Sequence, residues 1–191
     1  MSTKFFNNSP ENTLFDKFKG IAEGMPNFHS FLAVVGYFRS SGYFKLRKEL
    51  ANVQEIKILV GINIDSIFRK HNQALLMLEG DDEAREIYTK DFIQDVKDAQ
   101  YSPDVEEGIL QLCDDIVSGK LQMRIHKSKN LHAKFYLCLP QNFSPNTDGW
   151  VLMGSSNISD SGLGITQPPR YELNVAMKDY DDVAYCKNEF E

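Results

Sequence analysis

FLAVVGYF, the run from Phe31 to Phe38, gives the first indication of the fold. It is almost wholly apolar and partly β-branched, which is typical of a strand covered on both faces. A second run of this kind, IKILVGI, spans residues 56 to 62, and a helix from about Ser41 to Leu50 is predicted between the two. The strand, helix, strand order predicts a right-handed parallel crossover and therefore an α/β fold.

The flanking segments extend this pattern in both directions. Ser9 is predicted to cap a helix that has Pro10 as its first residue and that Gly24 and Pro26 bring to an end. From about residue 64 to 118 the pattern is helical, with room for two or three helices, and Ser102 is expected to cap the last of them. Further strands are predicted at 121–125, 131–139, 150–153 and 171–177, with a final helix at 180–191.

Length and composition fit one globular core. The chain has 191 residues, 42% of them hydrophobic, so we expect residues 1–191 to form a single domain. The last segment of the chain stops without a Gly or Pro ending, and we expect the chain to be a piece of a longer protein. No apolar run approaches the roughly 20 residues that span a bilayer, and no signal peptide begins the chain. We therefore expect no membrane association and a cytoplasmic location.

The three cysteines, Cys113, Cys138 and Cys186, are an odd number and stand far apart among apolar neighbours. This spacing fits neither a disulfide framework nor a zinc knuckle. We interpret them as buried free thiols.

Charge is unevenly distributed along the chain. The formal net charge of -6 and the pI near 5.3 argue against a protein that simply coats nucleic acid. Acidic side chains gather between Glu79 and Asp98, which on a helix makes a solvated face. Basic ones gather in a short segment without any acid, at Arg124, His126, Lys127, Lys129, His132 and Lys134. An anion could be received at this segment.

The segment LHAKFY, residues 131 to 136, carries the first chemical signal. On a strand, residues two apart point the same way, so His132 and Lys134 would share one face. A nucleophile would then stand beside a fixed positive charge. Taken alone, the same pattern is also that of an ordinary strand whose polar face meets water.

Two later segments add polar groups that could complete a site. Gly154-Ser155-Ser156-Asn157 follows an apolar strand, and such a turn can surround a phosphate oxygen with backbone and side-chain donors. In YELNV, residues 171 to 175, Glu172 and Asn174 would share a face, and the carboxylate could accept the N–H of His132. Each segment alone also fits a helix cap or a solvated strand edge.

Together, His-x-Lys on a strand, Gly-Ser-x-Asn after the next strand and Glu on the strand beyond resemble the phospholipase D superfamily. The chain is nearer to its bacterial nuclease branch, which includes domains that precede helicase or restriction modules, than to its lipases. The resemblance implies an α-β-α sandwich with a mixed central sheet. The superfamily's fuller motif has an aspartate shortly after the lysine, whereas residues 135–139 here contain no acid.

The resemblance also implies a role for each matching residue. His132 would attack phosphorus and form a phosphohistidine, which water resolves. Lys134, Asn157 and either Ser155 or Ser156 would hold the phosphate oxygens, and Glu172 would orient His132. Two histidines would divide the nucleophilic and acid roles, so that no metal ion or cofactor is expected.

That mechanism needs two His-x-Lys units, and the chain has one. A symmetric homodimer that shares one active site would supply the second. Trp150, Phe135 and Tyr136 could contribute to its interface or, as their apolar character favours, to the core. DNA is the expected substrate, with Arg124, His126, Lys127, Lys129 and Arg170 either guiding its backbone or forming a merely solvated face.

Three functions remain open on the sequence. The first is a metal-independent DNA endonuclease that acts as the cleavage module of a restriction or helicase-linked protein. The second is a catalytically silent module that binds DNA and dimerises, which the absent aspartate and the acidic pI favour. The third is a lipid-acting phosphodiesterase, against which stands the lack of an amphipathic membrane-binding helix.

Overall fold

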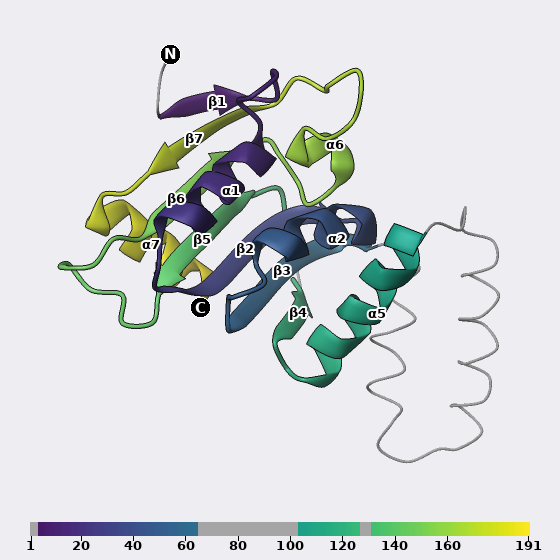
Figure 1. The fold of residues 1–191 in the computed structure, drawn as a ribbon. Coiled ribbons are helices and arrows are strands. Elements are labelled where there is room, and N and C mark those ends of the chain that lie inside the picture. The colour runs from purple at the N-terminus through teal and green to yellow at the C-terminus, as the bar shows by residue number, and fades with distance from the viewer. Residues whose placement is uncertain (1–3, 65–102, 127–130) are drawn as a thin grey trace.

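The structure, a computed structural model, describes residues 4–64, 103–126 and 131–191. In chain order its elements are β1 (Phe5–Asn7), α1 (Leu14–Gly24), β2 (Phe28–Phe38), α2 (Ser40–Glu49), β3 (Glu55–Ile64), α5 (Pro103–Val117), β4 (Leu121–Ile125), β5 (Phe135–Pro140), β6 (Trp150–Gly154), α6 (Asp160–Leu163), β7 (Leu173–Met177) and α7 (Tyr180–Phe190). They form one mixed sheet with helices packed against it (Figure 1). The predicted α/β class is confirmed.

The sheet has seven strands in the order β1-β7-β6-β5-β2-β3-β4. Strands β2, β3 and β4 run parallel to one another, and the remaining neighbours pair antiparallel. The parallel pairing of β2 with β3 across α2 is the one predicted from their two apolar runs. Because β5 enters antiparallel beside β2, the sheet is mixed.

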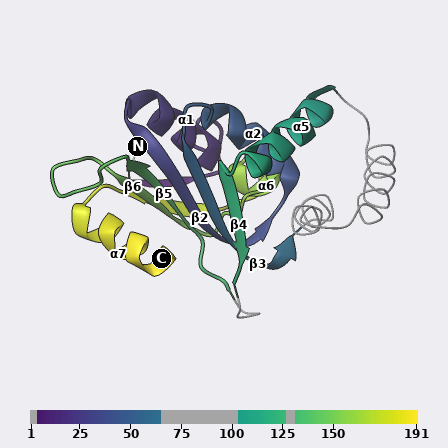
Figure 2. The ribbon, with the colours of Figure 1, turned by 90° about the horizontal axis from the view of Figure 1, so that it is seen from below.

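Helices cover both faces of the sheet. Figure 2 shows α1, α2 and α5 on one side and α7 on the other. Strand β2 serves both sides: Phe31, Ala33 and Val35 belong to the core under α1 and α2, while Leu32 and Val34 belong to the core under α7. Two apolar faces on one strand explain why its sequence is apolar throughout.

Helix α1 begins later than predicted. Thr13, not Ser9, is its N-cap, and Thr13 and Asp16 form a reciprocal capping box. That box satisfies two backbone N–H groups at the helix start, which a Ser9 cap without such a partner could not do. Glu11 has a φ of 60°, which a helix cannot include. The helix ends at Gly24, as predicted.

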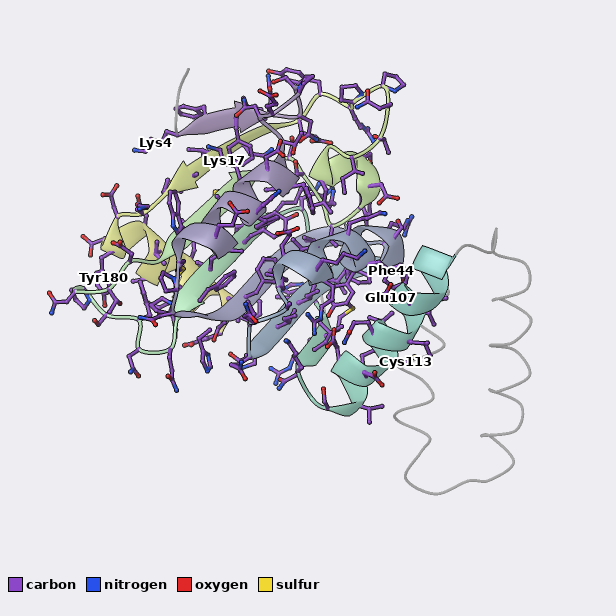
Figure 3. All side chains as sticks on the ribbon, viewed as in Figure 1. Lys4, Lys17, Phe44, Glu107, Cys113 and Tyr180 are labelled. Atoms are coloured by element: carbon purple, nitrogen blue, oxygen red, sulfur yellow. The ribbon has the colours of Figure 1, made fainter. Side chains whose placement is uncertain are left out.

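Helices α2 and α5 are tied together by a buried polar cluster. Asp115 of α5 accepts hydrogen bonds from the Tyr43 hydroxyl at 2.7 Å and from Arg47 Nη2 at 2.9 Å, and Arg47 Nε also pairs with it. Burial, with the Asp115 carboxylate second, raises the pKa of Tyr43 far above its ordinary value. Figure 3 labels Phe44 of α2 close to Glu107 of α5, at the same interface. The last of the helices predicted before residue 118 is confirmed as α5.

Some predictions lie outside the described residues. These are the other helices expected between residues 64 and 118, the Ser102 cap and the acidic face from Glu79 to Asp98. Two short elements were missed: β1, which pairs with β7, and the single-turn helix α6. Both are too short for a periodic pattern to reveal.

The three cysteines are free, but only two match the prediction of burial. Cys138 and Cys186 are buried, whereas Cys113 is only partly covered. Burial raises the pKa of all three thiols. Among the helices of the described residues, none is long and apolar enough to cross a membrane.

Candidate active site

The three predicted motifs lie at one end of the sheet, where β2 and β6 finish and β5 and β7 begin. Val34, near the carboxyl end of β2, pairs with Phe135 at the start of β5, and Phe135 pairs with Met153 near the end of β6. Gly154 in turn pairs with Asn174 at the start of β7. Antiparallel pairing thus places the segment before β5, the turn after β6 and the segment before β7 beside the end of β2.

The floor of the site is Gly36, at an irregularity in β2 where its pairing with β3 shifts register. A Cβ built on Gly36 would lie 3.4 Å from Asn157 Oδ1, 3.7 Å from Lys134 Nζ and 3.5 Å from the Leu131 carbonyl oxygen. Side chains from two predicted motifs therefore converge on one glycine. Bulges often occur beside active sites, where they redirect the chain.

Asn157 is held from several sides and is only 6% exposed. The backbone N–H of Tyr37 donates a 3.1 Å hydrogen bond to its Oδ1. The next residue, Ile158, forms a bridge with Phe38, so the turn after β6 extends along the end of β2. Helix α6 presses on the other side, where any side chain at Gly162 would overlap the Asn157 backbone.

Lys134 and His132 lie just before β5 and not on it, so the predicted start of this strand at Leu131 is wrong. The last link to β6 is the 3.2 Å bond from the Gly154 N–H to the Lys134 carbonyl. Beyond it, Lys134 Nζ turns back and donates to the His132 carbonyl at 2.8 Å. The His132 side chain is exposed. The two residues are neighbours, but the strand alternation expected to align them is absent.

Glu172 pairs with a serine of the turn after β6. The Ser155 hydroxyl donates to Glu172 Oε2 and accepts a 3.1 Å bond from the Leu173 N–H. Within the described residues no hydrogen bond joins Glu172 to His132. The carboxylate therefore supports the Ser155 side of the turn in this structure.

Ser156 lies beneath the site. It is fully buried, its Oγ accepts a 3.0 Å bond from Asn174 Nδ2, and its carbonyl accepts a 2.8 Å bond from the Tyr136 hydroxyl. Burial raises the pKa of Tyr136, with smaller contributions from the Glu172 carboxylate and the Tyr37 phenol. Tyr136 is therefore a neutral donor. Ser155, which is exposed, is placed to meet a ligand, and Ser156 is not.

The remaining basic residues are only partly described. Arg124 and Arg170 are exposed, and His126 is half-buried. Because β4 runs parallel to β2, Arg124 and His126, at the carboxyl end of β4, lie toward the same end of the sheet as the site. Lys127 and Lys129 lie outside the described residues.

The aromatic residues considered for an interface belong to the core. Phe135 and Tyr136 are buried, and Trp150 packs against the buried cluster. Three site residues were missed in the sequence: Gly36, Tyr37 and Tyr136. The one available signal was the glycine that interrupts the apolar run of β2.

No group of three or more carboxylate, imidazole or thiol side chains gathers as a metal site in the described part of the chain. Beside Gly36 lie the ammonium of Lys134 and the amide of Asn157; the Ser155 hydroxyl belongs to the turn just before Asn157, and the exposed imidazole of His132 is two residues before the lysine. Such a set of donors suits an anion. Lys134 lies beside the Asn157 amide over Gly36, and this arrangement can receive the oxygens of a phosphate.

Comparison with known proteins gives only distant likenesses. No protein-family model matches the chain, and no curated protein matches it. Among solved structures, yeast tyrosyl-DNA phosphodiesterase is similar with a TM-score of 0.48 at 13% identity, over 91% of this chain and 31% of that one. Phosphatidylserine synthase of Haemophilus influenzae Rd KW20 is similar with a TM-score of 0.48 at 14% identity, over 97% and 36%. The chain thus spans about a third of each.

Proposed function

We propose that this chain is a metal-independent phosphodiesterase that cleaves DNA through a phosphohistidine at His132, and that it is the nuclease module of a restriction or helicase-linked protein. The observation that carries the proposal is the convergence of Lys134 Nζ and Asn157 Oδ1 over Gly36, with the exposed imidazole of His132 two residues from the lysine. His132 would be the nucleophile, and the donors to one phosphate would be the ammonium of Lys134 and the amide nitrogen of Asn157, whose oxygen already accepts from the Tyr37 N–H.

In the first step, an imidazole nitrogen of His132 attacks phosphorus and the bond to the leaving oxygen breaks. A second imidazole gives that oxygen its proton. In the second step, the second imidazole, now neutral, takes a proton from water as the water oxygen attacks phosphorus, the phosphorus–nitrogen bond breaks and both imidazoles return to their starting states. Lys134 and the Asn157 amide nitrogen stabilise the added charge on the phosphate oxygens. The Ser155 hydroxyl can join them only after its hydrogen leaves Glu172.

The second imidazole is assigned to a second copy of the chain. His132 belongs to the one His-x-Lys pair of the sequence, and its side chain is exposed just before the central strand β5. A two-fold axis near this end of the sheet would bring two copies of His132 to one phosphate. The proposed enzyme is therefore a homodimer with one active site.

Cleavage of supercoiled plasmid in the presence of EDTA tests this function. Wild-type protein is expected to cut, and His132→Ala is expected to lose cutting. His29→Ala is the matched control, because His29 lies near the start of β2, at the other end of the strand, and bonds Ser30 there. Cutting that survives in His132→Ala would contradict the assignment.

A second function is supported by two observations. Residues 135–139 contain no acid, and Glu172 is bonded to Ser155. Both suit a silent module that binds DNA and dimerises. Binding of plasmid without cleavage by the wild-type protein would favour this alternative.

A further inference from the structure

Beside Asn157 lies a cation-aromatic pair that the catalytic steps do not use. Tyr37 is the penultimate residue of β2, and Arg39 is the residue directly before α2. The Tyr37 N–H bonds Asn157 Oδ1 at 3.1 Å, and the Arg39 N–H bonds the Ile158 carbonyl at 2.9 Å. Both residues are thereby fixed to the turn that carries Asn157.

The side chains of this pair are in cation–π contact. The guanidinium carbon of Arg39 lies 5.3 Å from the centroid of the Tyr37 ring, and Nη1 donates to the Phe38 carbonyl at 3.3 Å. Arg39 is exposed, Tyr37 is half-buried, and no ion pair to Arg39 occurs among the described residues. The positive charge is therefore oriented but not neutralised there.

The chemistry of the pair fits a nucleic acid. Arginine presents several N–H groups in a plane that matches phosphate oxygens, and aromatic rings and guanidinium planes stack on unpaired bases. Tyr37 directly follows Gly36 in β2 and bonds Asn157, so the nucleotide next to a phosphate held over Gly36 could extend toward this pair. A simple phosphodiester with small substituents would not reach it.

We propose that the Tyr37–Arg39 pair binds the nucleotide next to the reacting phosphate of a single-stranded nucleic acid. The inference rests on the proposed function for the position of that phosphate. It narrows the substrate to strands whose base beside the reacting phosphate is unpaired, which includes single strands and the locally opened regions of a supercoiled plasmid, and it adds a subsite at the end of β2.

Two substrates test the proposal. One is a short fluorescein-labelled single-stranded oligonucleotide, and the other is methyl 4-nitrophenyl phosphate, which has one phosphodiester and no neighbouring nucleotide. Arg39→Ala is expected to raise the KM for the oligonucleotide about tenfold to a hundredfold, the usual range for a lost hydrogen bond to a charged group. Both kcat and KM for methyl 4-nitrophenyl phosphate should stay as in the wild type.

Two further comparisons separate this subsite from general charge effects. Lys48→Ala removes an exposed cation from the last turn of α2 and should leave the oligonucleotide KM unchanged. Tyr37→Leu should raise that KM about tenfold, whereas Tyr37→Phe keeps the ring and should not. In Arg39→Ala, the slope of log affinity against log salt should fall by about 0.7.

The proposal is overturned if Arg39→Ala leaves both substrates unaffected or impairs both equally. If the wild-type protein hydrolyses neither substrate, the proposed enzyme fails, and the subsite is then judged by fluorescence anisotropy on the same oligonucleotide. Weaker binding by Arg39→Ala, with Lys48→Ala unchanged, would still support the subsite, and equal binding by both would refute it.

Discussion

The backbone N–H of Tyr37 donates a hydrogen bond to Oδ1 of Asn157 across 3.1 Å. Because the oxygen of this amide is used by β2, its nitrogen is the group left to donate to a ligand. Among the described residues no other hydrogen bond to the Asn157 side chain occurs. The relationship makes Asn157 a donor that is oriented before the substrate arrives.

Replacing Asn157 by alanine is expected to lower kcat about a hundredfold to a thousandfold, the usual effect of removing one donor to a developing oxyanion. Asn157→Asp should lower kcat further, because it places a negative charge beside the phosphate. Hydrolysis of methyl 4-nitrophenyl phosphate measures both effects. Asn52→Asp, at an exposed position between α2 and β3, is the control, and kcat values equal to its own would refute the role of Asn157.

Gly36→Ala tests the floor of the site. The added methyl group would make ordinary contacts with Asn157, Lys134 and Leu131, so the protein should fold, but the space over Gly36 would be filled. We expect lower kcat/KM with nearly unchanged thermal stability. Gly20→Ala is the control: nothing lies near its Cβ, and it should stabilise α1 by about 0.5–1 kcal/mol without changing activity. Normal kcat/KM in Gly36→Ala would place the phosphate elsewhere.

Tyr136→Phe tests the support under the turn. It removes the 2.8 Å hydrogen bond to the Ser156 carbonyl and should cost about 1–3 kcal/mol of stability. Tyr43→Phe removes a comparable buried bond, to Asp115 at 2.7 Å, away from the site. Chemical denaturation should show similar losses for both. Only Tyr136→Phe should lower kcat. An equal loss of kcat in Tyr43→Phe would show that Tyr136→Phe acts through general destabilisation alone.

The shared site predicts a characteristic result on mixing subunits. If each active site needs His132 from two copies, dimers with one His132→Ala chain are inactive. Plasmid cleavage should then fall with the square of the wild-type fraction after the chains are exchanged. A linear fall would show that each chain acts alone, and sedimentation at the same concentrations would report whether a dimer is present.

Much of the fold follows from the sequence because β2 and β3, the two longest of the described strands, are largely apolar runs. The strand at 121–125 lies where it was predicted, and α7 differs by one residue at its end. The predicted start of α1 was wrong because both Ser9 and Thr13 are residue types that cap helices well. The choice between them depends on the hydrogen bonds between Thr13 and Asp16. The deciding signal was local: of two candidate caps, the one whose third following residue can bond back to it starts the helix.

The motif residues of the candidate site could be found by type, but their partners could not. Glu172 was expected to meet His132, yet the register of β6 and β7 brings Ser155 to it. Ser156 and Ser155 are equivalent in sequence, and only the packing of Tyr136 and Asn174 shows that one of them is buried. Such contacts join residues far apart in the chain and leave no periodic signal.

Trapping the phosphohistidine would show directly whether His132 is the nucleophile. Wild-type protein is mixed with an oligonucleotide labelled with ³²P at internal phosphates, quenched in alkali and digested, and the labelled peptide is identified. The account predicts an acid-labile label on His132 that is absent from His132→Ala and present in His29→Ala. Substrate turnover with no label on His132, or a label on another residue, would contradict it.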